Sequence, residues 1–348
     1  MDGVATFIDG RVGRIVLRRP KALNALTTEM CQAIEVALLA WRDDPQVTMA
    51  LIEGEGERAF CAGADIAALH AMGRQGDFAS AQHFFHEEYR LNRLIAHYPK
   101  PYVALMDGIV MGGGVGLSAH GSHRIVTERS AVAMPECAIG LVPDVGSSLL
   151  LTRAPGRTGE YLGLTGARMG AADALFAGFA DVMVPTDRLA ALKAELLAAG
   201  RPDVIAPFAV DAGSSRLARH RDETDAAFAG GDLLAIVGRL EAGASSFATE
   251  AAAAIRKGSP LSLAATLAII AAVREEPTVE RALVMEYRFA TRALPKGEFI
   301  EGIRAAVVDK DRQPRWSPAR LEELDVSRLL EMLAPVADEG DLQDGPPL

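Results

Sequence analysis

The stretch Met106-Asp-Gly-Ile-Val-Met-Gly-Gly-Gly-Val-Gly-Leu-Ser118 decides the fold prediction. It follows Pro101-Tyr-Val-Ala-Leu105, a short apolar segment typical of a strand, and leads into residues compatible with a helix start. The glycines Gly112 to Gly114 permit backbone dihedrals closed to other residues and leave their amides uncovered. Amides gathered at a helix N-terminus bind anions, and in an enzyme that acts on a carbonyl they stabilise an oxyanion. A tight turn with glycines only for close packing explains the pattern equally well.

A second small-residue turn, Ala59-Phe-Cys-Ala-Gly-Ala-Asp-Ile66, also leads into a helical pattern. Upstream, Val12 to Leu17 and Val47 to Ile52 are predicted strands, separated by a helix that begins at Thr27 or Thr28. Strand and helix alternate again around the glycine-rich turn. Such alternation predicts an α/β core built from crossover units.

The chain is predicted to divide into four segments: an α/β core at 1–200, an irregular insertion or connector at 201–244, a helical C-terminal region at 245–335, and a flexible acidic tail at 336–348. The second segment is polar and contains Pro202, Pro207 and Gly213-Ser-Ser215, so its structure is weakly specified. The tail contains glycine and proline, which predicts a frayed end. Within the core, Phe78 to His97 is expected to form one long helix.

Composition limits the class of protein. The 348 residues are 49% hydrophobic and 24% charged, as in ordinary globular enzymes. A net charge of −10 disfavours nucleic acid and anionic membranes as partners, although a local basic patch can still hold a polyanionic ligand. Cys31, Cys61 and Cys137 are widely spaced and indicate reduced thiols. No apolar run is long enough to cross a bilayer and the N-terminus resembles no targeting peptide, so we expect a cytoplasmic protein without a membrane partner.

Two carboxylates, Glu136 and Asp144, are candidates for proton transfer. Each directly follows a proline within apolar sequence. Burial in such surroundings raises a carboxyl pKa toward the useful range, and two such groups near one site can act as base and acid. The alternative is that each carboxylate only caps the start of a helix.

Three other chemistries fit the sequence less well. Ser118 and His120 do not form a Gly-x-Ser-x-Gly elbow, and neighbours two apart on a helix do not meet. His83 and His86, with Glu87 nearby, lack the His-Glu-x-x-His pattern of a zinc site and are more typical of a solvated helix face. The glycines match neither a phosphate-binding P-loop nor a dinucleotide fingerprint. We therefore expect no metal site.

Motifs in order along the chain resemble the enoyl-CoA hydratase/isomerase (crotonase) superfamily: Ala59 to Ile66, Met111-Gly-Gly-Gly114 and Met134-Pro-Glu136. Further motifs resemble more narrowly the hydrolases of 3-hydroxyisobutyryl-CoA, namely Arg19-Pro-Lys-Ala-Leu-Asn-Ala25, Phe85-His-Glu-Glu-Tyr89, Met134 to Gly146, Phe299-Ile-Glu-Gly-Ile-Arg-Ala305 and Val308-Asp-Lys-Asp311. The resemblance covers residues 8 to 200 and 245 to 325. It implies a crotonase-like spiral of ββα units with two packed sheets and a helical C-terminal region.

The resemblance also implies a site. The backbone N–H groups of Ala64 and Gly113 would form an oxyanion hole, and Glu136 and Asp144 would be catalytic. Substrate-binding residues would be Glu88, Gly113, Glu136 and Asp144, with Glu88 contacting the hydroxyl group. Coenzyme A would lie along Lys21, Ala22, Leu23, Ala62, Asp65, Ile66 and Lys310, with the two lysines near its phosphates. The acyl-CoA is itself the substrate, so no metal or redox cofactor is expected. Because the superfamily often forms trimers and pairs of trimers, the resemblance also allows a homo-oligomer, a trimer or hexamer.

Two positions favour hydrolysis over hydration. Hydratases of the superfamily carry a glutamate shortly after the glycine run, where this chain has Gly116, and another at the Glu136 position. Asp144 is instead the acidic position of the hydrolase subfamily. Glu136 would deprotonate a water or attack the carbonyl itself, and Asp144 would orient the hydroxyl or water and help protonate the departing thiolate. The implied pathway is valine breakdown. The alternatives are an enoyl-CoA hydratase or isomerase using Glu136 alone, and a non-catalytic acyl-CoA-binding protein.

Overall fold

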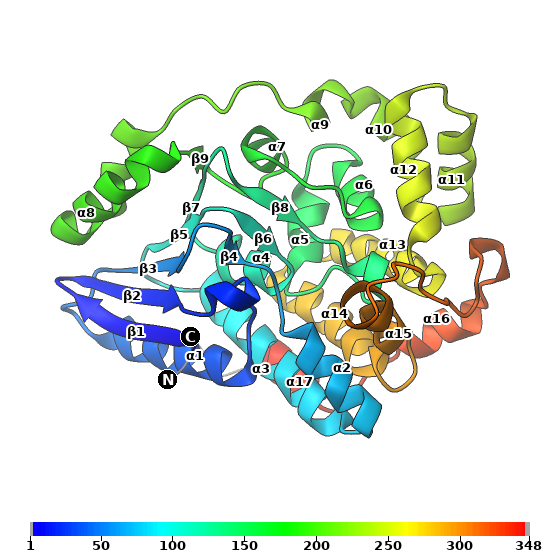
Figure 1. Ribbon diagram of the computed structural model, residues 1–348, viewed down its shortest axis with the longest axis horizontal. Coiled ribbons are helices and arrows are strands. Elements are labelled where there is room, and N and C mark those ends of the chain that lie inside the picture. The colour runs from blue at the N-terminus through cyan, green and yellow to red at the C-terminus, as the bar shows by residue number, and fades with distance from the viewer. Residues whose placement is uncertain (1–2, 345–348) are drawn as a thin grey trace.

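The computed structural model describes residues 3–344, in which two sheets are surrounded by helices (Figure 1). The larger sheet has the strand order β1-β2-β3-β5-β7-β9; β1 and β2 are antiparallel and the other neighbours are parallel. Its strands are β1 (Val4–Asp9), β2 (Val12–Leu17), β3 (Met49–Gly54), β5 (Tyr102–Met106), β7 (His123–Val126) and β9 (Val182–Met183). The smaller sheet is parallel and contains β4 (Ala59–Cys61), β6 (Ile109–Met111) and β8 (Ala131–Ala133).

Each turn of the chain adds one strand to each sheet: β3 and then β4, β5 and then β6, β7 and then β8. Helices α2 (Ile66–Gln75) and α4 (Gly113–Ser118) follow the first two pairs. Because β4, β6 and β8 are parallel, the segments that follow them leave the smaller sheet at the same edge. The spiral of ββα units with two packed sheets is therefore confirmed, and it gathers three loops in one place.

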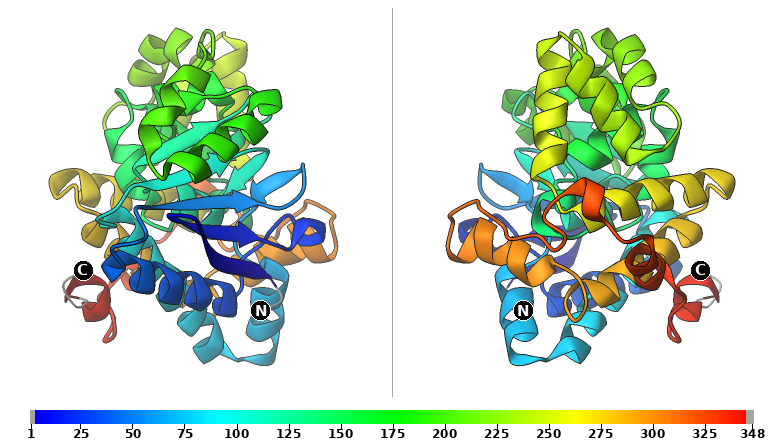
Figure 2. Two further views of the ribbon diagram at one scale, coloured as in Figure 1. Left: turned by 90° about the vertical axis from the view of Figure 1, so that its left-hand side faces the viewer. Right: turned by 90° about the vertical axis from the view of Figure 1, so that its right-hand side faces the viewer.

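At β3, in the middle of the larger sheet, both faces are buried. Along β3, Ala50 and Ile52 join the main core, while Met49 and Leu51 face a smaller apolar cluster. That cluster includes Leu192 of α8 (Leu189–Ala199), which lies over the sheet in the left view of Figure 2. Alternate residues of a strand point to opposite faces, so a strand covered on both sides is apolar throughout.

The other helices pack around this spiral. The Thr27 side chain caps α1 (Thr28–Asp43), and α3 (Phe78–Ala96) confirms the predicted long helix. The C-terminal region is helical, as predicted, and its α14 (Val279–Ala293) packs along α3 (Figure 1). The remaining helices are α5 (Ser147–Arg153), α6 (Thr158–Thr165), α7 (Ala171–Phe176), α12 (Ser246–Lys257), α13 (Pro260–Glu275), α14 (Val279–Ala293), α15 (Phe299–Ile303) and α16 (Val326–Leu333). No helix within residues 3–344 is long and apolar enough to cross a membrane.

The prediction of irregular structure over 201–244 is wrong. The segment contains a 3-10 helix (Pro202–Phe208), α9 (Arg216–Arg219), α10 (Arg221–Ala227) and α11 (Leu233–Ala242). Phe228, Ile236 and Leu240 are buried in the main core. The side chain of Asp232 caps α11 by accepting the N–H of Ala235. A narrow apolar face and a good cap thus suffice for helix formation despite the polar composition.

The prediction of a flexible tail is also wrong for the part that the structure describes. Helix α17 (Gly340–Asp344) contacts α14 and α3, and Leu342 is fully buried. Asp338 accepts a hydrogen bond from the Tyr287 hydroxyl (2.6 Å), so the acidic residues have partners on α14. Residues 345–348 lie outside the described part of the chain. The main core extends from Val4 to Leu342, and the boundaries at 200, 244 and 335 remain predictions.

Candidate active site

The segments that follow β4, β6 and β8 surround one cavity of about 690 Å³. Every residue predicted for the site lines this cavity: Lys21, Ala22, Leu23, Ala62, Ala64, Asp65, Ile66, Glu88, Gly113, Glu136, Asp144 and Lys310. The fold thus brings together residues that are nearly 300 positions apart in the chain. Their individual roles remain predictions.

The two turns with uncovered amides lie side by side at the cavity wall. The position that a Cβ on Gly63 would take is 3.7 Å from the Gly113 nitrogen and 3.3 Å from the Met111 carbonyl oxygen. Gly63 (φ 106°) and Gly112 (φ 49°) adopt the left-handed region, which favours glycine and permits this close approach. Within residues 3–344, no backbone hydrogen bond uses the N–H of Ala64 or Gly113. Both donors are therefore free for a ligand.

Glu88 and Glu136 reach the glycine turn from two different elements. Glu136 begins the 3-10 helix Glu136–Ile139, and its Oε1 is 3.0 Å from the place that a Cβ on Gly112 would take. Glu88, on α3, would collide through its Oε1 with a Cβ on Gly113. Both side chains are buried, and within the described residues Glu88 Oε1 and Glu136 Oε2 have no hydrogen-bond partner. Such atoms are uncommon in proteins, and both belong to residues that line the cavity.

Asp144 lies in the loop between that 3-10 helix and α5, with a side chain that is also buried. Its Oδ2 accepts a hydrogen bond from the Tyr89 hydroxyl (2.8 Å). Neither the 3-10 helix Glu136–Ile139 nor α5 has a side-chain cap. Side-chain capping therefore does not explain either carboxylate, although Glu136 does lie in the first turn of its 3-10 helix.

Burial determines the protonation of these carboxyl groups. It raises the pKa of Glu88 and of Glu136 well above the usual glutamate range, and the charge of Asp144 raises both pKa values further. Burial also raises the pKa of Asp144 to about 7, although the hydrogen bond from Tyr89 opposes this change. Neighbouring carboxyl groups in an apolar site cannot all ionise, so they hold protons in common near neutral pH. The cluster can both accept and donate a proton.

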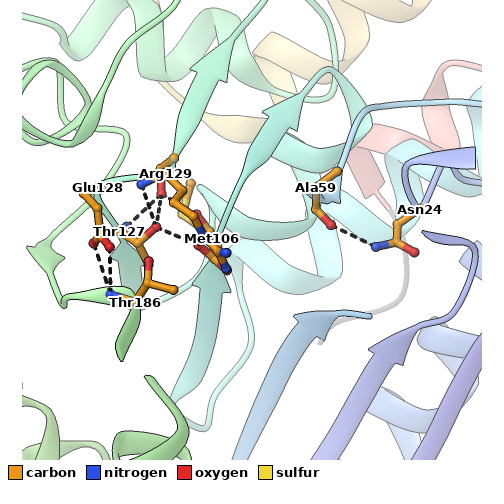
Figure 3. A network of polar contacts seen from close by, with 9 residues as sticks. Asn24, Ala59, Met106, Thr127, Glu128, Arg129 and Thr186 are labelled. Atoms are coloured by element: carbon orange, nitrogen blue, oxygen red, sulfur yellow. Dashed lines mark hydrogen bonds and ion pairs between the residues drawn. The ribbon is translucent and has the colours of Figure 1, made fainter. Parts of the chain in front are cut away.

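Cations lie at the exposed side of the cavity. Lys21, Arg58 and Lys310 are exposed and line it, whereas the three acidic residues are buried. The loop that carries Lys21 is fixed by buried Asn24, whose Nδ2 donates to the carbonyl oxygen of Ala59 (2.9 Å; Figure 3). A chain of net charge −10 therefore still has a positive rim where a polyanion can bind.

Two further carboxylates fix local segments of the chain: Asp65, which lines the cavity, and Glu128, which does not. The carboxylate of Asp65 accepts from Arg19 (2.8 Å) and caps α2, so this side chain is already engaged. Figure 3 also shows Glu128, whose carboxylate accepts the N–H of Thr186 (3.0 Å). This contact ties the chain after β7 to the chain after β9.

The competing chemistries find no support in the structure. Ser118 Oγ donates to the Gly114 carbonyl (2.7 Å), whereas His120 Nε2 bonds the Val145 carbonyl (2.8 Å), so these side chains are engaged separately. In the described part of the chain there is no group of three His, Cys, Asp or Glu side chains that can hold a metal ion. That the reaction needs no metal or redox cofactor stays a prediction.

Sequence reasoning missed several residues at or beside the cavity. The cavity is lined by Phe85, Phe299 and Arg58, and Tyr89, which does not line it, donates a hydrogen bond to Asp144. The motifs on which the family resemblance is based include Phe85, Tyr89 and Phe299, but the resemblance predicted no role for these residues. Glu286, buried on α14, had no signal because its burial depends on packing between distant helices.

The chain belongs to the enoyl-CoA hydratase/isomerase family, a class that its spiral fold also fits: the family's sequence model matches residues 12–333. A Gallus gallus relative, 42% identical over 90% of this chain and 84% of its own length, is named 3-hydroxyisobutyryl-CoA hydrolase, mitochondrial. The Homo sapiens relative has the same name and is 40% identical with the same coverage. An Arabidopsis thaliana relative named 3-hydroxyisobutyryl-CoA hydrolase 1 is 41% identical, over 94% of this chain and 90% of its own length.

Two solved structures share the whole fold. One, from Rhodobacter sphaeroides 2.4.1 and described as an enoyl-CoA hydratase, is 50% identical with a TM-score of 0.92, covering 97% of this chain and 99% of its own. Another, from Mycobacterium thermoresistibile and described as a carnitinyl-CoA dehydratase, is 40% identical with a TM-score of 0.93, covering 97% and 98%. The names of the relatives and of the solved structures therefore refer to different reactions. Which of these reactions this chain catalyses has to be argued from the residues of its own site.

Proposed function

We propose that this chain hydrolyses the thioester of a short, branched 3-hydroxyacyl-CoA. The preferred substrate is 3-hydroxyisobutyryl-CoA, which yields 3-hydroxyisobutyrate and coenzyme A in valine breakdown. The names of the curated relatives support the substrate. The surroundings of Gly116 support the reaction type.

The space beside Gly116 carries the argument. In paired-glutamate hydratases the corresponding position holds one of the two catalytic glutamates. Here a Cβ on Gly116 would lie only 2.6 Å from Asn92 Nδ2 and 2.7 Å from Val145 Cβ. The side chains of Asn92 and Val145 therefore fill the place of that glutamate. Glu136 keeps Asp144 as its acidic neighbour and lacks the glutamate partner that hydration by the paired-glutamate route requires.

In the proposed reaction the thioester carbonyl oxygen lies between the N–H groups of Ala64 and Gly113. Negative charge develops on this oxygen as the acyl carbon becomes tetrahedral. Fixed donors stabilise that charge because they need no reorganisation during the reaction. Loss of one such donor costs about 3 kcal/mol of barrier in comparable sites.

Glu136 starts the attack in its ionised form, with the shared proton on a neighbouring carboxyl group, by one of two routes. It deprotonates a water that adds to the acyl carbon, or it attacks the carbon itself and forms an anhydride that water then opens. In the first route the water oxygen ends on the acyl carbon, whereas in the second route water adds to one of the two carbonyl carbons of the anhydride and releases the acid and Glu136. In both routes the C–S bond breaks and the coenzyme A thiolate takes up a proton. Asp144, with a pKa near 7, is present in both forms at neutral pH and supplies this proton.

A panel of thioesters tests the reaction type. We expect rapid release of free thiol from 3-hydroxyisobutyryl-CoA, detected with a disulfide reagent, and no loss of the enoyl absorbance of crotonyl-CoA. Hydration of crotonyl-CoA without thiol release would make the chain a hydratase. Binding of acyl-CoA without turnover of any thioester would instead indicate a non-catalytic acyl-CoA-binding protein.

Location and assembly are separate proposals. The vertebrate relatives are named mitochondrial, whereas the sequence of this chain led us to predict a cytoplasmic enzyme. The expected partner is the acyl-CoA substrate, with no nucleic acid or membrane, and a homotrimer or hexamer is the assembly that the family resemblance allows.

A further inference from the structure

Tyr89 is held rigidly behind the active site. It follows Glu88 on α3, is fully buried and does not line the cavity. Its ring meets the rings of Phe85 (centroids 6.1 Å apart) and Tyr287 (5.9 Å apart) edge to face. A ring fixed on two sides directs its hydroxyl to one place. That place is Asp144 Oδ2, 2.8 Å away.

The backbone of the Asp144 loop is fixed from another helix. Val145 (φ 57°) and Gly146 (φ 78°) are both in the left-handed region, which is costly for valine. Glu286 of α14 accepts the N–H groups of Gly146 (2.6 Å) and Ser148 (2.9 Å) and the Ser148 hydroxyl (2.5 Å). Since α14 holds the loop backbone, the direction of the Asp144 carboxyl group depends on its own hydrogen bond.

We propose that Tyr89 is the positioning residue for Asp144: its hydroxyl fixes the orientation of the carboxyl group and stabilises its ionised form. This role rests on the proposed catalytic function of Asp144. Tyr89 acts through Asp144 because it does not reach the cavity itself.

The surroundings of Asp144 make this hydrogen bond consequential. The titratable groups that face it are Glu88 on α3, Glu136 after β8 and Glu286 on α14, all of them acidic. His120 binds the next carbonyl, that of Val145, and burial lowers its pKa to about 4, so it is neutral. Among the described residues, Tyr89 supplies the side-chain hydrogen bond that favours the Asp144 anion.

Tyr89→Phe tests this role, because it keeps the buried ring and removes only the hydroxyl. We expect kcat for thiol release to fall at least tenfold, with KM within about twofold of wild type. The limb of the pH–rate profile that reports Asp144 should move to higher pH by about one unit, since a charge-stabilising hydrogen bond is lost. This limb moves to higher pH whether the ionised or the protonated form of Asp144 is the active one, because the pKa of Asp144 rises in both cases.

Tyr287→Phe is the matched control. Tyr287 is a buried tyrosine on the facing helix α14, but its hydroxyl donates to Asp338 (2.6 Å) and not to the site. Its ring remains against Tyr89 after the substitution. We expect unchanged kcat and an unchanged pH profile.

A readout independent of turnover completes the test. Infrared titration of the Asp144 carboxyl band, identified by its loss in Asp144→Asn, should give a higher pKa in Tyr89→Phe. A pKa that is unchanged or lower would overturn the role of Tyr89, as would wild-type kcat and pH profile in that variant while Asp144→Asn is inactive. Wild-type thiol release by Asp144→Asn would instead overturn the catalytic function proposed for Asp144.

Discussion

At the residue scale, the site buries three carboxyl groups without a cation beside them. Within residues 3–344 no ion pair includes Glu88, Glu136 or Asp144. Burial of such groups without a partner is costly and shifts them toward their neutral forms. Proteins retain this arrangement where it supports function, and the function proposed here is proton transfer next to the N–H groups of Ala64 and Gly113.

The same acidic cluster predicts discrimination by charge. Methylmalonyl-CoA has a carboxylate where 3-hydroxyisobutyryl-CoA has a hydroxymethyl group, so it brings a further negative charge to Glu88, Glu136 and Asp144. We expect its kcat/KM for thiol release to be at least 100-fold lower. In Glu88→Gln, the kcat/KM values for the two substrates should lie closer together than in wild type. Equal rates of thiol release from the two substrates with the wild-type enzyme would contradict the electrostatic role of the cluster.

At the element scale, the contact of α3 with α4 leaves no room for the second glutamate of a paired-glutamate hydratase. Gly116 on α4 faces Asn92 on α3, and both amide atoms of Asn92 are buried without a partner among the described residues. A longer side chain at position 116 would displace Asn92 or Val145. The helix packing, and not the glycine alone, thus determines which acids the site contains.

A substitution at this contact gives a testable result. Gly116→Glu should lower the melting temperature, because overpacking and a buried charge each destabilise by about 1–3 kcal/mol or more. It should not create crotonyl-CoA hydration. Combining it with Asn92→Gly, which makes room, should restore part of the lost stability, as measured by thermal unfolding. A stable, hydrating Gly116→Glu single variant would show that the space is not filled.

Prediction from sequence succeeded where a local pattern and the tertiary structure agree. The helix predicted at 78–97 is α3, and the strand predicted at 47–52 is β3 at Met49–Gly54, displaced by two residues because pairing with β2 starts at Met49. The predicted site residues converge because the parallel smaller sheet gathers three loops. The sequence could not reveal Glu286 or Asn92, since their roles depend on contacts between helices far apart in the chain.

At the scale of the whole molecule, the helical C-terminal region forms part of the active site. Glu286 on α14 holds the loop of Asp144, and Phe299 and Lys310 line the cavity. The tail packs on α14 through Asp338 and Glu339. The helical C-terminal region therefore supports the loop that carries Asp144.

The contribution of Glu286 to the stability of the folded protein depends on pH. Burial raises its pKa from 4.5 to about 8, so its contribution to stability is fully present below pH 4.5 and is lost as pH rises toward 8. The glutamine side chain of Glu286→Gln cannot ionise, but its NH2 group would face an N–H donor that the glutamate accepts, so that hydrogen bond is lost. We expect the variant to melt lower than wild type at pH 5, with a deficit that shrinks toward pH 8.

Glu339→Gln provides the comparison for this measurement. Glu339 pairs with Arg288, and that hydrogen-bonded pair lowers the pKa of Glu339 below its usual range. The contribution of Glu339 to stability is lost only as pH falls through this lowered pKa. The difference in melting temperature between Glu339→Gln and wild type should therefore stay constant between pH 5 and 8. A Glu286→Gln deficit that grows with pH would contradict the raised pKa of Glu286.

The most direct test of the site is steady-state thiol release from 3-hydroxyisobutyryl-CoA by wild type and Glu136→Gln. The substitution keeps the size of the side chain and removes its capacity to accept a proton or to attack the acyl carbon. We expect kcat to fall by at least about 10³-fold, with the fold intact by circular dichroism and thermal unfolding. Near-wild-type thiol release by folded Glu136→Gln would contradict the assignment of this cavity as the hydrolytic site.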